Sequence, residues 1–250
     1  SSYGGAGGES GQVSVAVTDA SVTTVGYGLM GISVSGVGGN GGDGGVQQDS
    51  SNAGNGGSAL TGSQVTLTSS DASVQTGVST SGNSAGAILV SSQGGIGGTG
   101  TEYDNSVLGA GRAGNGGTGG SAQDASVTLG GSASSIFVTT EGDSSVGIRV
   151  QSIGGAGGHG GKIEGNGSVS SKGSAGGSGG YAGEVEATIG ESIGAQIQTQ
   201  GTESHGIILL SQGGSPGDAG DIETLISNAG QNGGTGGAGE EIRFTFGNGS

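Results

Sequence analysis

Short stretches in which apolar and polar residues alternate recur along the chain, and this alternation predicts half-buried β-strands. The stretches are of three kinds that follow one another in a fixed order. The first kind is predicted at 12–17, 64–67, 125–129 and 184–189, the second at 21–24, 73–76, 136–140 and 195–199, and the third at 31–34, 86–90, 147–150 and 206–209. No stretch has the 3.6-residue period of an amphipathic helix. The pattern therefore predicts an all-β chain with essentially no α-helix.

This order of strands repeats along the sequence. Each strand of the third kind leads into a Gly-Gly pair, at 38/39, 94/95, 154/155 and 213/214, and an Ala-Gly pair recurs at 53/54, 113/114, 175/176 and 229/230. Both series give a period of about 58 residues. We interpret residues 1–250 as a single elongated repeat domain, with repeats at 4–52, 53–112, 113–174 and 175–228 and a partial fifth at 229–250.

Glycine segments built of Gly-Gly-X triplets separate the third strand of one repeat from the first strand of the next. The clearest lie at 38–45, 94–100, 154–161 and 233–239. A polyproline-II-type helix has three residues per turn, so X would lie along one edge and bare backbone along the other two. Bare backbones approach closely enough to hydrogen-bond laterally. We expect a layer of polyglycine-II helices packed against the strands, and the alternative interpretation is flexible glycine linkers.

The composition favours order that comes from the backbone. Of the 250 residues, 68 are Gly, and hydrophobic residues make up only 29%, which is too little for a conventional core. Ordering each residue costs about 1–2 kcal/mol of conformational entropy. Such a chain needs hydrogen bonds repeated many times over, as solenoids use them. The expected fold is a repeat β-solenoid or β-sheet stack with an associated layer of polyglycine-II helices.

The charge narrows the possible partners. Five basic residues face twenty acidic ones, for a net charge of −15. Without a basic patch the chain is a poor ligand for nucleic acid or anionic membranes. The sequence contains no run of about 18 apolar residues, so we expect no transmembrane segment. The start at Ser1-Ser2-Tyr3, with neither Met nor signal peptide, suggests a processed form or an excised fragment.

The repeat resembles a known family. Residues 147–158, which read GIRVQSIGGAGG, are similar to the repeat of very large glycine-rich autotransporter passenger domains. Variants of the phrase occur at 88–95 and 207–214, and the stretch from Val65 to Gly86 is similar too. The resemblance covers most of the chain. It implies a secreted, surface-displayed β-solenoid of a Gram-negative bacterium, with a role in adhesion, biofilm or surface coating.

The sequence offers no catalytic or cofactor-binding site, and we expect no enzyme. The only histidines, His159 and His205, lie in different sequence contexts, and no Cys is present. Residues 38–46 partly fit the calcium-binding nonapeptide, with Gly45 where a large apolar residue belongs. Asp43 is therefore a weak calcium candidate, and calcium is the one cofactor that we consider.

The last predicted strand, at 241–246, begins a repeat whose second strand does not follow. We expect its apolar residues Ile242, Phe244 and Phe246 to mediate assembly, either by head-to-tail self-association or by contact with covalently neighbouring repeats. The predicted function is an extracellular structural or adhesive protein of the bacterial surface, either a repeat array or a filament subunit, that contributes to adhesion or a biofilm matrix.

A ligand-binding solenoid module is the alternative function, directed at carbohydrate such as surface glycans or at ice. Flat threonine ladders would favour ice. Thr23-Thr24 and Thr139-Thr140 suggest such a ladder, but we expect Gln75-Thr76 and Gln198-Thr199 to interrupt it.

Overall fold

The computed structural model describes residues 4–44, 62–104, 113–132, 135–164, 173–190, 194–223 and 231–247. These residues form β-strands and extended segments, and none of them is helical, which confirms the all-β prediction. Every strand pairing is parallel. Parallel neighbours require a long connection between consecutive strands of one sheet, and here the other strands and the glycine segments provide it.

The strands form three long sheets and one short sheet. The first sheet contains β1 (Val13–Thr18), β4 (Ser63–Ser69), β8 (Ala125–Gly131), β12 (Val185–Ile189) and β16 (Ile242–Phe246), in that order. The second contains β2 (Ser21–Val25), β5 (Thr76–Ser81), β9 (Ile136–Glu141) and β13 (Gln196–Gln200), and the third β3 (Met30–Val37), β6 (Gly86–Gln93), β10 (Val146–Ile153) and β14 (His205–Gln212). The short sheet contains β7 (Tyr103–Asp104), β11 (Ile163–Glu164) and β15 (Ile222–Glu223).

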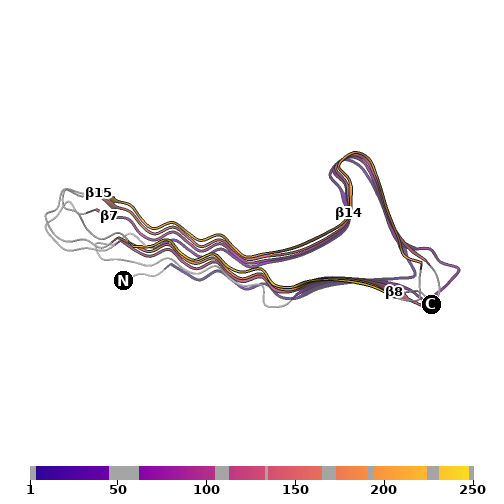
Figure 1. Ribbon diagram of the computed structural model, residues 1–250, viewed down its shortest axis with the longest axis horizontal. Helices are drawn as coiled ribbons and strands as arrows, with labels where there is room; N and C mark the ends of the chain where they lie inside the picture. Colours follow the sequence, from indigo (N-terminus) through magenta and orange to yellow (C-terminus); the bar gives the residue numbers. More distant parts are fainter. Residues whose placement is uncertain are drawn as a thin grey trace.

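One rung of the molecule is one passage of the chain through the first, second and third sheets, out along a glycine segment and back along another. Figure 1 shows described segments of successive rungs running side by side. At the end of the molecule where β8 and β14 are labelled, the chain turns through the three long sheets. The glycine segments extend from there to β7 and β15 at the other end. The long axis of the molecule therefore follows the glycine segments.

One predicted strand is wrong. Residues 73–76 were expected to form the second strand of their repeat, but β5 spans Thr76–Ser81. The N–H of Val74 instead donates to the carbonyl of Asp71, which closes a turn. In the register of the second sheet, Val78 lies between the partly buried Val22 and the buried Val138, and this inward valine column is what fixes the position of the strand.

The core is built from columns of equivalent side chains. In the third sheet, Ile88 lies between Ile32 and Ile148, and Ile207 follows in the same column. Ile88 is fully buried, as are Val65 and Leu129 in the first sheet. Equivalent residues of successive rungs pack on one another, so each rung repeats the packing of the previous one. A chain with few apolar residues can therefore still form a buried core.

A buried threonine column interrupts this apolar interior. Thr24, Thr80, Thr140 and Thr199 are paired in register along the second sheet. Thr80 and Thr140 are 1% exposed, and their hydroxyl oxygens have no hydrogen-bond partner among the described residues. A buried hydroxyl that lacks a partner carries a desolvation cost of about 1–3 kcal/mol.

We expect Thr140→Val to stabilise the protein by about 1 kcal/mol, because Val keeps the branched shape and removes the unpaired hydroxyl. Thr139→Val is the matched control, since Thr139 lies on the outward face of the same strand, and it should change the free energy of unfolding by about 0.5 kcal/mol or less. Urea denaturation followed by circular dichroism gives both values. A loss of stability in Thr140→Val would show that this hydroxyl is satisfied.

The glycine segments are held by two sets of backbone hydrogen bonds. The outgoing segments are 38–44, 94–101, 154–161 and 213–220, and the returning segments are 4–11, 114–122, 174–182 and 232–239. The first glycine of a triplet donates within its own layer, as Gly97 does to the carbonyl of Ala156 at 2.9 Å. The second glycine donates to the opposite layer, as Gly158 does to Gly117 at 2.8 Å. The two layers therefore form one bonded slab with a three-residue period.

Side chains at the X positions add a third set of hydrogen bonds. The Oδ1 atom of Asn40 accepts the N–H of Ile96 at 3.0 Å, and that of Asp43 accepts the N–H of Thr99 at 2.7 Å. The same contact joins Asn115 to Ala175 at 2.9 Å in the returning layer. In these contacts a short polar side chain at X binds the X residue one rung further along, which explains why Asn and Asp recur there.

The single proline fits this scheme. Pro216 occupies the place of a first glycine in the fourth outgoing segment, equivalent to Gly97 and Gly157, which donate to the next outgoing segment. Proline has no N–H to donate. No outgoing segment follows the fourth among the described residues, so Pro216 forfeits no hydrogen bond there.

Candidate functional site

The outward face of the first sheet carries a column of threonines. Thr66, Thr128, Thr188 and Thr245 are paired in register on four successive strands, and Ala16 takes this place on β1. Neighbours in such a column are about 4.8 Å apart. The parallel column beside it contains Thr18, Thr68 and Gly130, so the regular row is one threonine wide.

The threonine ladder that the sequence suggested is corrected by this register. Thr140 pairs with Thr80, so Ser79-Thr80 is the counterpart of Thr139-Thr140, and Gln75-Thr76 is not. The unbroken column through Thr80 and Thr140 faces the core. Sequence reasoning missed the outward threonines of the first sheet, although the motif Val-Thr-Leu at 65–67 and 127–129 contains the signal.

The predicted assembly residues lie on β16 at the open edge of the first sheet. Ile242, Phe244 and Phe246 are in register with Val185, Ala187 and Ile189, which are all buried core residues of β12. The exposed fractions of the three β16 residues are 49%, 51% and 61%. They occupy core positions of a fifth rung for which the described residues supply no strand of the second or third sheet. The edge is therefore an uncovered core face.

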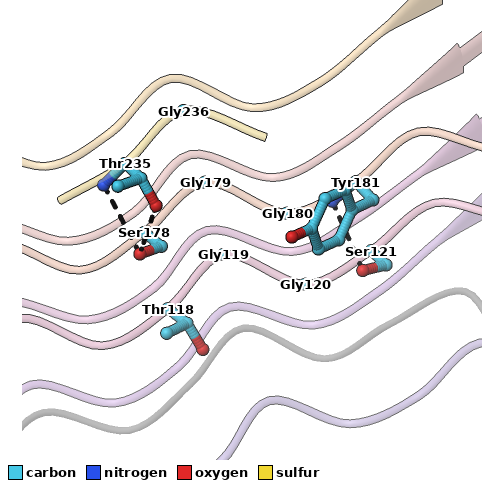
Figure 2. A pocket seen from close by; sticks show the side chains of 10 residues that line it. All are labelled: Thr118, Gly119, Gly120, Ser121, Ser178, Gly179, Gly180, Tyr181, Thr235 and Gly236. Atoms are coloured by element: carbon cyan, nitrogen blue, oxygen red, sulfur yellow. Dashed lines mark hydrogen bonds between the residues drawn. The ribbon is translucent and has the colours of Figure 1, made fainter. Parts of the chain in front are cut away.

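A shallow groove of about 430 Å³ crosses the outer face of the returning layer (Figure 2). Its floor consists of glycines from three successive segments: Gly119, Gly120, Gly179, Gly180 and Gly236. On one side lie Thr118, Ser178 and Thr235, and on the other Ser121 and Tyr181. Tyr181 is 60% exposed.

Hydrogen bonds fix the walls of this groove. The backbone N–H and the hydroxyl of Thr235 both donate to Oγ of Ser178, at 3.4 and 3.1 Å. The N–H of Tyr181 donates to Oγ of Ser121 at 3.3 Å (Figure 2). Each contact joins X residues of adjacent rungs. The groove is therefore a preformed row of hydroxyls beside one aromatic ring.

Acidic side chains form their own column where the returning segments enter the first sheet. Asp124 accepts the N–H of Glu184 at 2.9 Å, and Arg243 binds Glu184 at 3.2 Å and Glu241 at 2.8 Å. The bond to Arg243 lowers the pKa of Glu241, and the same bond raises the pKa of Arg243. These exposed ion pairs contribute little stability. This strip of the surface carries three carboxylates, those of Asp124, Glu184 and Glu241, and one cation, Arg243.

Two aspartates at the turns between sheets bind the next rung. Oδ1 of Asp143 accepts the N–H of Thr202 at 2.8 Å, and this bond lowers its pKa. The carboxylate of Asp19 accepts the side-chain hydroxyl and the N–H of Ser70 and the N–H of Asp71, and these bonds lower its pKa. Both carboxylates favour the ionised form because their oxygen atoms accept hydrogen bonds from the next rung.

The remaining residues singled out from the sequence lie apart. Asp43 uses Oδ1 to accept the N–H of Thr99, and Gly45 and Val46 of the calcium motif are outside the described residues. His159 receives the N–H of Asp218 at 3.2 Å, and His205 begins β14. Across the described ranges, no three His, Asp or Glu side chains are grouped so that they could hold a metal ion. Calcium binding by Asp43 stays a prediction.

Comparisons with known proteins give no family for the chain. No family model and no curated protein matches it. A solved structure, a nine polyproline type II helical bundle springtail antifreeze protein from Granisotoma rainieri, aligns at 19% identity over 82% of this chain and 94% of its own, with a TM-score of 0.13. A TM-score this low does not establish a shared fold. In the part of the chain that the structure describes, no helix is long and apolar enough to cross a membrane.

Proposed function

We propose that the chain is a structural and adhesive repeat protein of the bacterial cell surface, and not an enzyme. In this proposal the chain is a β-solenoid in which each rung carries two polyglycine-II helices. The observation that carries the proposal is the uncovered core face of β16, because it presents core positions on which a further rung can stack. The resemblance of residues 147–158 to autotransporter passenger repeats supports the extracellular location.

The hydrogen bonds support the polyglycine-II description. Along a segment, donors such as Gly114, Gly117 and Gly120 recur every third residue, which is the period of a helix with three residues per turn. Bonds run to neighbours in both layers, as a lateral packing of such helices requires. A flexible linker does not require donors at every third residue.

The strand order indicates which neighbour covers β16. Covering Phe244 requires one strand each from the second and third sheets, stacked on β13 and β14. A second copy of these residues presents β1, a first-sheet strand, before β2 and β3. Stacked directly on β16, it would leave one place empty in each of the other two sheets. The edge therefore fits a rung that continues in chain order better than a head-to-tail copy.

An extended chain tests this proposal. A second copy of residues 194–223 placed after Gly247 supplies the two missing strands and an outgoing segment. In the extended chain, Phe244→Asp should cost about 3–5 kcal/mol, the range for loss of a buried phenylalanine. In the 250-residue chain, where Phe244 is 51% exposed, the same substitution should cost about 1 kcal/mol or less.

Thr245→Asp is the control, because Thr245 lies on the outward face of the same strand and should cost little in both chains. Equal costs of Phe244→Asp in the two chains would contradict rung-on-rung stacking. Sedimentation of the unextended chain measures head-to-tail association separately.

The outward threonines are the observation that bears on the alternative function, a ligand-binding module. A single row does not give a two-dimensional lattice, because Gly130 breaks the adjacent column after Thr68. The ice-binding version therefore has less support than a version in which the surface binds carbohydrate.

A further inference from the structure

The groove around Tyr181 has the chemistry of a ligand site that the scaffold itself does not require. An X residue needs only a short polar side chain to bind the next rung, as Asn115 and Ser121 show. Tyr181 adds a large aromatic ring beside a floor of bare backbone, and the residue is 60% exposed. An exposed aromatic ring next to hydroxyls offers one apolar contact face and several hydrogen-bonding groups.

The groove does not suit a peptide strand. Addition of a peptide strand requires backbone N–H and C=O groups with no partner. Four of the floor glycines already donate at 2.8 Å: Gly119 to the carbonyl of Ser178, Gly120 to Gly95, Gly179 to Thr235 and Gly180 to Gly155. Among the described residues, Gly236 is the one floor glycine without a backbone acceptor, and a single open N–H is too few for a strand ladder. Recognition therefore rests on side-chain hydroxyls and the tyrosine ring.

The groove does not suit an anionic ligand either. None of its ten lining residues is charged, and the chain carries a net charge of −15. A polyanion would be repelled without any local cation to offset the repulsion. A neutral ligand with apolar faces and hydroxyl edges matches, and sugar rings have this character.

The groove is open and crosses three rungs, so a chain can pass along it. Rungs repeat at about 4.8 Å, which is similar to the length of one sugar residue in an extended glucan. We propose that this groove binds an extended neutral polysaccharide, with one sugar ring stacked on Tyr181 and its neighbours hydrogen-bonded by the hydroxyls of Thr118, Ser178 and Thr235. The inference rests on the proposed adhesive function and names its ligand class. The smaller groove on the outgoing face, lined by Gln93, Ile153 and Gln212, has no aromatic ring and is not included.

Affinity electrophoresis of the whole chain tests the proposal, in gels that contain hydroxyethylcellulose, laminarin, dextran or galactomannan as neutral probes and polygalacturonate as the anionic probe. At least one neutral probe should retard the wild-type chain. Tyr181→Ala should raise the dissociation constant at least tenfold for that probe, and Tyr181→Phe should change it less than threefold. Tyr27→Ala is the matched control, because Tyr27 is 80% exposed but lies at a turn far along the chain from the groove, and it should bind as wild type does.

Failure of every neutral probe to retard the wild type, retention of binding in Tyr181→Ala, or preferential binding of polygalacturonate would each overturn the inference. Thermal melting of Tyr181→Ala shows whether the fold is intact, and Tyr181→Phe remains a test if the alanine variant misfolds. The Phe244 experiment contains no glycan. Failure of rung stacking and failure of polysaccharide binding are therefore observed separately.

Discussion

Gly177→Ala is expected to destabilise the protein by about 3–5 kcal/mol, which is the combined effect of overpacking and broken hydrogen bonds. A Cβ atom on Gly177 would lie 1.9 Å from the carbonyl oxygen and 2.5 Å from the carbonyl carbon of Gly117. Both atoms are backbone, so no side chain can rotate away. Gly177 donates to Gly158 and accepts from Gly217, both at 2.8 Å, so a shift of its backbone weakens bonds to the outgoing layer on two sides.

Gly5→Ala is the matched control. Gly5 holds the same place in its triplet as Gly177 and accepts the N–H of Gly42 at 2.7 Å, but a Cβ there would meet nothing within 4 Å. This variant should be between zero and about 1 kcal/mol more stable than wild type, because alanine restricts the unfolded chain. Thermal and urea unfolding give both values. Equal effects of the two substitutions would mean that the glycine slab is not close-packed in solution.

The sequence predicted which strands form better than it predicted how strands of successive rungs are aligned. Period-two alternation located the first and third strands of each repeat because every second residue of these strands is buried, as Val65 and Leu67 are. The strand at 73–76 was misplaced because Ser-Val-Gln-Thr alternates as well as the true strand does. A better signal was the glycine that ends each second strand. Gly26, Gly82, Gly142 and Gly201 all have positive φ, and counting back from them locates every second strand.

The surface features were harder to predict because they depend on register between rungs. The outward column of Thr66 and Thr128 exists only when strands more than 60 positions apart align, and unequal loop lengths hide that alignment in the sequence. The groove at Tyr181 likewise depends on which X residues of three segments lie side by side. By contrast, the assembly role of Phe244 followed from a local pattern, an alternating strand without a successor. That role remains a prediction, and the exposed core face is what supports it.

Ile88→Ala should destabilise the protein by about 2–5 kcal/mol, the usual range for Ile→Ala in a core. Ile88 is fully buried between Ile32 and Ile148, and truncation opens a cavity that neighbouring rungs cannot close without leaving their own register. Leu89→Ala is the control on the opposite face of β6, where the side chain is only partly buried, and it should cost about 1 kcal/mol or less.

The position of Ile88 makes the manner of unfolding as informative as its energy. In a stack where each rung contacts only its neighbours, stability is a sum of rung and interface terms. A defect at the second rung should release the first and second rungs in an early transition, while amides of β10 and β14 keep near wild-type protection in hydrogen exchange. Loss of protection in all rungs at once would show that the array unfolds as one unit, because the glycine slab then couples the rungs more strongly than the core does.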